Sequence, residues 1–66
     1  MVKWSDLIAR NEDLVKDFAL GHVSARNFAG GFRGRPNEAR QVIRNYGSTE
    51  GRALARKALR RRGLIA

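Results

Sequence analysis

The stretch Gly30-Gly31-Phe32-Arg33-Gly34-Arg35-Pro36 divides this 66-residue chain into two helical halves. Paired glycines end a helix readily, because glycine loses more conformational entropy in a helix than any other residue. A proline is well suited to the first position of a helix, since the N–H that it lacks would have no intrahelical partner there. The sequence therefore predicts a break near residue 30, an arginine- and glycine-rich loop, and a new helix from Pro36.

Two helices are predicted before this loop. In the first, over residues 5–20, apolar side chains recur at spacings of three and four and so share one face, namely Trp4, Leu7, Ile8, Leu14, Val15 and Phe18. Ser5 is expected to cap its start, and Gly21 follows its end. Asp6–Arg10 and Glu12–Lys16 have the spacing of ion pairs along a helix. The second helix is short, from the capping residue Ser24 to about residue 29.

Two further helices are predicted after the loop. The third covers residues 36–46, with an apolar stripe of Ala39, Val42, Ile43 and Tyr46, and Gly47 ends it. The fourth begins at Ser48 or Thr49 and reaches about residue 62, with a stripe of Leu54, Ala55, Ala58 and Leu59. Arg52, Arg56 and Arg60 recur every four residues, which predicts an exposed cationic row opposite that stripe. The fold class is all-α: one domain over residues 1–66, a small bundle of three to four helices.

Composition argues against several classes of protein. The chain has no cysteine and one histidine, His22, which argues against disulfides, thiolate sites and a histidine-based metal cluster. The sequence contains no recognisable arrangement of a nucleophile and a base. A nucleotide-binding glycine loop follows a β-strand, and no strand is predicted before the glycines of this loop. We expect no enzyme activity, no metal and no cofactor. No segment approaches the ~20 apolar residues of a membrane span, and no signal peptide is apparent, so the expected location is the cytoplasm at the nucleoid, or a virion if a phage encodes the chain.

The positive charge is concentrated in the second part of the chain. The formal net charge is +8, yet residues 1–21 carry four acidic and three basic side chains. Residues 22–66 carry eleven Lys or Arg and only Glu38 and Glu50 as acids. A near-neutral scaffold joined to a strongly basic, arginine-rich part predicts a surface that binds a polyanion, with nucleic acid as the first candidate.

The Arg33-Gly34-Arg35 triplet fits the minor groove of DNA. Gly34 would let the backbone approach the groove floor, and the two guanidinium groups would reach along a groove of negative potential. With Pro36, the triplet matches the core of the AT-hook, which inserts into A·T-rich minor grooves. Asn37 and the amides at the start of the third helix could hold a phosphate. Further phosphate contacts are expected from Arg40, Arg44, Arg52, Arg56 and Arg60.

The order of these elements resembles the DNA-binding domain of the actinobacterial H-NS-like nucleoid silencers. The likeness covers roughly residues 10–46: Leu20-Gly21-His22-Val23-Ser24 has the place of the Gly-His pair of that family, and Arg33-Gly34-Arg35 precedes a short helix. The resemblance implies a minor-groove role for the triplet and silencing of A·T-rich genes. In this chain Pro36 follows Arg35 directly, whereas the family has an apolar residue between them.

Other interpretations of the same residues stay open. The third and fourth helices, joined by Tyr46-Gly47-Ser48-Thr49, are compatible with a helix-turn-helix that reads the major groove, with Val42 and Ala53 packed inside and Glu50, Arg52 and Arg56 facing bases. RNA or ribosome binding is a second alternative, and a basic inhibitor that docks on an acidic protein is a third. The acidic residues of the first helix disfavour a membrane-active peptide as the function. The first helix could also form the contact between two copies of a homodimer.

Overall fold

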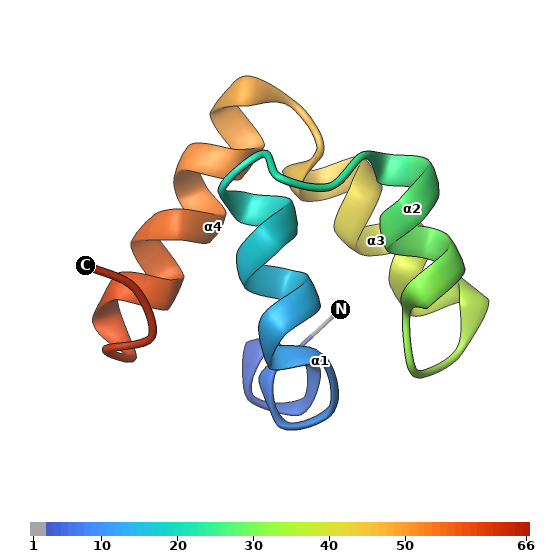
Figure 1. Cartoon of the computed structure of the whole chain (residues 1–66), viewed down its shortest axis with the longest axis horizontal. Helices are drawn as coiled ribbons and strands as arrows, with labels where there is room; N and C mark the ends of the chain where they lie inside the picture. Colours follow the sequence, from blue (N-terminus) through green and yellow to red (C-terminus); the bar gives the residue numbers. More distant parts are fainter. Residues whose placement is uncertain (1–2) are drawn as a thin grey trace.

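A computed structural model describes residues 3–66 and shows four helices connected by short turns (Figure 1). They are α1 (Trp4–Ala19), α2 (Ala25–Gly31), α3 (Pro36–Tyr46) and α4 (Thr49–Arg61). No strand occurs in this part of the chain, so the all-α prediction is confirmed. None of these helices is both long and apolar enough to cross a bilayer.

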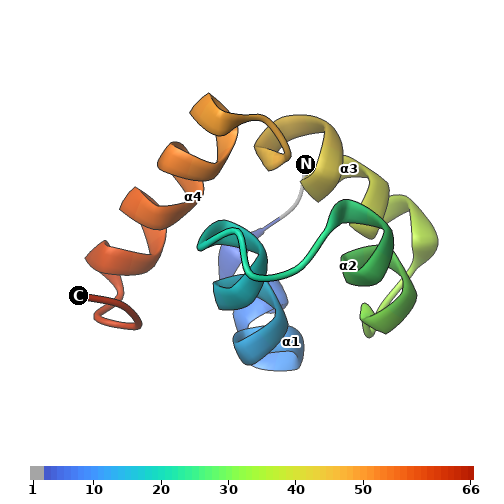
Figure 2. The same ribbon diagram turned by 45° about the horizontal axis from the view of Figure 1, so that its top comes forward.

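The helix α1 stands between the other elements. Figures 1 and 2 show α4 on one side of it and α2 with α3 on the other. Contacts link α1 to α2 and α4, and link α3 to the same two helices, so the four helices enclose one core. Its buried apolar residues are Leu7, Val15, Phe18, Ala19, Phe28, Ala39, Val42, Ala55 and Leu59. The rings of Phe18 and Phe28 lie 4.5 Å apart, which anchors the seven-residue α2 by packing, because a helix of that length is not stable alone.

Most helix ends follow the predicted chemistry. The Ser24 hydroxyl accepts from the Asn27 amide at 3.2 Å, and the Ser48 hydroxyl accepts from the Gly51 amide at 3.0 Å. Gly21 has a φ of +81° just after α1, a conformation that glycine adopts without strain. The Ser5 cap is wrong: α1 starts one residue earlier, at Trp4, after Lys3, which contributes no side-chain cap. Trp4 is held there by Tyr46, whose ring centroid lies 4.9 Å away.

The predicted first helix is interrupted at Asn11. This residue has φ −139° and ψ +36°, so α1 consists of two helical pieces joined by a kink. The apolar spacing continues across the kink, which explains why periodicity alone predicts one regular helix. An asparagine side chain can form hydrogen bonds with backbone groups when its own residue is not helical. At the kink, the Asn11 side chain bonds to the backbone of Arg33 in this way.

The packing of α4 corrects two predictions. Ala55 and Leu59 are buried as expected, but Leu54 is 60 % exposed and does not belong to the apolar stripe. Ala53 is also exposed, so it is not an inner residue of a unit formed by α3 and α4. Gly51 faces α3 instead: a Cβ atom there would lie 2.5 Å from the carbonyl oxygen of Asn45. The crossing of the two helices is therefore set by a close backbone approach at Gly51.

Candidate nucleic-acid interface

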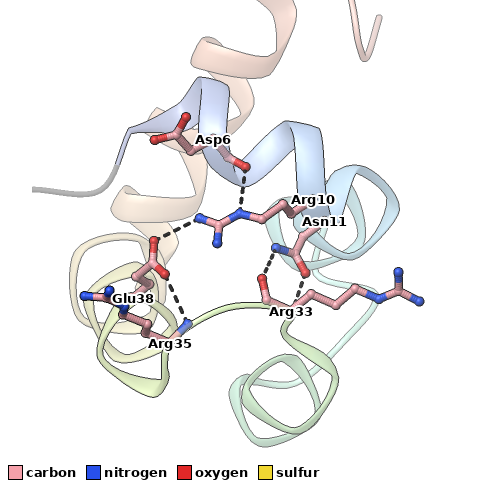
Figure 3. Close-up of polar contacts among 6 residues, drawn as sticks. All are labelled: Asp6, Arg10, Asn11, Arg33, Arg35 and Glu38. Atoms are coloured by element: carbon pink, nitrogen blue, oxygen red, sulfur yellow. Dashed lines mark hydrogen bonds and ion pairs between the residues drawn. The ribbon is translucent and has the colours of Figure 1, made fainter.

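The arginine loop, residues 32–35, is fastened to the kink of α1 by Asn11. The Asn11 Nδ2 donates to the carbonyl oxygen of Arg33 at 3.0 Å, and its Oδ1 accepts from the amide of Arg33 at 2.7 Å (Figure 3). Asn11 is only 6 % exposed, and these two bonds satisfy both polar groups of a buried amide. The backbone position of Arg33 is therefore set by a residue 22 positions earlier in the chain.

Glu38 fastens the other end of the same loop. Its Oε1 accepts from the amide of Arg35 at 3.1 Å, and its Oε2 accepts from a guanidinium nitrogen of Arg10 at 3.1 Å. The Arg35 amide hydrogen bond and the Arg10 charge hold the pKa of the Glu38 carboxyl below its ordinary value of 4.5. The expected Asp6–Arg10 ion pair is not formed, because Arg10 turns to Glu38 and gives Asp6 only a long bond of 3.4 Å to its backbone carbonyl.

Gly34 is required by this loop for reasons internal to the fold. Its φ of +150° is one that side-chain-bearing residues rarely adopt. A Cβ atom at this position would lie 2.8 Å from the Phe32 ring and 3.1 Å from Oε1 of Glu38. The glycine between the two arginines thus lets the loop close onto α1 and α3, whether or not a ligand approaches it.

The side chains of Arg33 and Arg35 are exposed, in contrast to their fixed backbone. Figure 3 shows the Arg33 side chain pointing away from the polar cluster around Glu38. Within residues 3–66, no hydrogen bond or ion pair engages either guanidinium group. The loop therefore presents two exposed cationic groups on a hydrogen-bonded backbone, and the Arg35 charge also helps to lower the pKa of the Glu38 carboxyl.

One face of α3 carries three predicted site residues. Asn37, Arg40 and Arg44 are all exposed, and Gln41, which sequence reasoning did not select, lies among them. At about 100° per residue, these four side chains fall within an arc of roughly 100°, opposite the buried Ala39 and Val42. We call these four residues the α3 outer face. The spacing of Gln41, four after Asn37 and three before Arg44, was the signal in the sequence that could have found it.

Two of the predicted phosphate-binding arginines of α4 have structural partners. Arg56 donates to the carbonyl oxygen of Ala19 at 2.9 Å, and the Arg52 guanidinium lies 4.9 Å from the centre of the Phe18 ring. Both are half-buried, so the exposed row predicted for α4 is wrong at these two positions. The C-terminal end of α1 offers unpaired carbonyls and partial negative charge, which favour the Arg56 cation, and the face of the Phe18 ring attracts the Arg52 guanidinium.

The third member of that row differs from the other two. Arg60 is exposed, and its Nε donates to the backbone carbonyl of Ala66 at 3.0 Å. Lys57 and Arg61 are exposed beside it. Arg35 lies with Asn37 and Gln41 around Glu38, whereas Arg33 points away from them and lies beside Glu12 and Asp13 of α1 (Figure 3). Arg52 and Arg56 are directed toward α1.

Comparison of this chain with protein-family models, with curated proteins and with solved structures gave no match.

Proposed function

We propose that this protein binds double-stranded DNA through the arginine loop and the α3 outer face. The observation that carries the proposal is the position of Glu38, the only acid in residues 33–44. Its carboxylate is directed to Arg10 and to the Arg35 amide, so the exposed charges of this segment are all positive. Arg35, Arg40 and Arg44, with no exposed acid in their own segment, are complementary to a row of phosphates, whereas Arg33 lies beside the exposed Glu12 and Asp13 of α1.

The type of cation supports the same conclusion. All the charges on this surface are guanidinium groups, which bind phosphate with a planar fork and stay protonated. Each phosphate neutralised releases condensed counterions, so log K should fall with log salt with a slope of about −0.9 per contact. Four contacts give a slope of about −4, and a steeper slope is expected if Arg60 and its neighbours also reach the backbone.

A role in the nucleoid follows from this activity as a proposal. Such a binding surface suits an architectural protein, a silencer, or a regulator encoded by a phage or plasmid. The Arg33-Gly34-Arg35 motif favours A·T-rich targets if its guanidinium groups enter the minor groove.

The test is a binding titration with two double variants of equal charge. Arg40→Gln with Arg44→Gln removes two charges from the α3 outer face, and Lys57→Gln with Arg61→Gln removes two exposed charges from α4. We expect the first pair to weaken binding to a duplex by at least about tenfold more than the second, because phosphate contacts depend on position. Circular dichroism would confirm that both variants fold.

Two results would overturn the proposal. One is the absence of duplex binding at low salt. The other is an equal loss of affinity in the two double variants, which would show that binding depends on net charge and not on the position of the charges. A structured RNA hairpin, titrated at the same salt, tests the RNA alternative: tighter binding to the hairpin than to duplex DNA would replace DNA with RNA as the ligand.

A further inference from the structure

The helices α2 and α3 are joined by a turn of the length found in helix-turn-helix units. Four residues, 32–35, connect Gly31 to Pro36, and they include Gly34. The two helices pack against each other, and α2 also packs against α1. Figures 1 and 2 show α2 crossing α3 rather than running alongside it. A short glycine-containing turn between two crossing helices is the arrangement that places a second helix in the major groove.

The α3 outer face carries the side chains that read base edges. Asn and Gln can form two hydrogen bonds with adenine, and Arg can form two with guanine. Asn37, Arg40, Gln41 and Arg44 lie at helical spacings of three, one and three, and every one is exposed. The major groove, about 12 Å wide, admits a helix, whereas the minor groove, about 6 Å wide, does not.

The loop contacts favour the same orientation. Minor-groove insertion of Arg33-Gly34-Arg35 would bring the loop backbone to the groove floor. In this structure both backbone polar groups of Arg33 are bonded to Asn11, and the amide of Arg35 is bonded to Glu38. The two guanidinium groups of the loop are exposed and precede α3, so they suit phosphates at the edge of the major groove.

In the other helix pair, α3 and α4, the turn is shorter and the candidate base-reading arginines contact the rest of the fold. Two residues, Gly47 and Ser48, separate α3 from α4. Arg52 and Arg56, which would have to face bases, contact Phe18 and Ala19 of α1.

We infer that α2, the arginine loop and α3 form a helix-turn-helix in which the α3 outer face reads bases in the major groove while Arg33 and Arg35 bind phosphates. This inference rests on the proposed DNA binding and adds the groove, the reading residues and the class of target. The target is a duplex containing adenine and guanine at the contacted positions, not an A·T-rich tract as such.

The experiment begins with selection of bound sites from a random duplex library by the full chain. Affinities for the selected site and a scrambled site are then measured for the wild type, Gln41→Ala and Asn27→Ala. Asn27 is an exposed amide on α2 outside the α3 outer face and serves as the matched control. We expect Gln41→Ala to reduce the ratio of the two affinities about tenfold, as loss of a base contact does, and Asn27→Ala to leave it unchanged.

Groove-specific competitors provide the second arm. Methyl green, which occupies the major groove, should displace the protein, and netropsin, which occupies the minor groove, should not. Displacement by netropsin, or an unchanged affinity ratio in Gln41→Ala, would overturn the assignment of α3 while leaving DNA binding intact. The absence of any duplex binding at low salt would overturn the proposed function itself.

Discussion

Arg33 and Arg35 in the loop and Arg52 and Arg56 in α4 use the same side chain in opposite ways. In the loop the backbone is bonded to Asn11 and Glu38, and the exposed guanidinium groups form no hydrogen bond within residues 3–66. In α4 the guanidinium groups contact α1, through the Phe18 ring and the Ala19 carbonyl. A count of basic residues treats the two pairs alike. The two pairs differ in their availability to a ligand, because a guanidinium group that already contacts the fold has less capacity to bind a phosphate.

The difference arises from two places on α1. At the kink, the buried side-chain amide of Asn11 bonds to the backbone of Arg33, so the arginine loop is held by its backbone. Its C-terminal end presents carbonyls, which attract cations, so the neighbouring helix is held by its arginine side chains. One helix thus fastens both arginine-rich segments and leaves only one of them free for a ligand.

The largest expected effect tests the packing beneath α4. Leu59 is fully buried, and Leu59→Ala should lower the free energy of unfolding by about 2–5 kcal/mol. Leu54→Ala is the control, because an exposed leucine should cost less than about 0.5 kcal/mol. Thermal unfolding monitored by circular dichroism checks both. A larger loss of stability for Leu54→Ala than for Leu59→Ala would show that the two sides of α4 have been exchanged.

The next effect tests the attachment of the loop. Asn11→Ala leaves the amide and carbonyl of Arg33 without their partner, which should cost about 1–3 kcal/mol. Asn11→Asp keeps the acceptor but sets a carboxylate against the Arg33 carbonyl, so it should also destabilise. Urea unfolding gives the values, and Asn27→Ala is a control without such bonds. An Asn11→Ala protein as stable as wild type would contradict the role assigned to this residue.

A smaller effect separates the two kinds of arginine directly. Arg56→Ala removes the bond to Ala19 and should cost about 1 kcal/mol, a shift of roughly 4–8 °C in Tm for a domain of this size. Arg33→Ala should leave Tm almost unchanged and weaken duplex binding. Melting and binding measured on both variants complete the comparison. A loss of affinity without a loss of stability in Arg56→Ala would place α4 at the DNA instead.

The smallest effect concerns pH. The pKa of Glu38 is lowered in the folded chain, so its contacts stabilise the fold fully above 4.5 and are lost as the pH falls through the lowered pKa. We expect Glu38→Gln to melt below the wild type near neutral pH, with the gap closing on acidification. Glu50→Gln, at an exposed carboxylate of α4, controls for the loss of one acid. A gap that stays constant with pH would show that the Glu38 charge does not act in this way.

Local chemistry accounts for what the sequence predicted correctly. Ser24, Ser48 and Pro36 mark helix starts, and Gly21 follows a helix end, because each acts on backbone groups within a few residues. Apolar spacing likewise located Leu59 and Val42 in the core. The candidate site was predicted in part on the same basis: Asn37, Arg40 and Arg44 share a face because helical periodicity places them there.

Pairings between distant residues decided the rest. The kink at Asn11, the turning of Glu38 toward Arg10 and the capture of Arg56 by Ala19 join residues between 22 and 37 positions apart. Spacing along the chain carries no information about such pairs, because helical periodicity describes one helix at a time. The sequence by itself determined four helices and a basic second half, since propensity, capping and charge are local. Only the tertiary structure decided which arginines are free, because that depends on what each helix packs against.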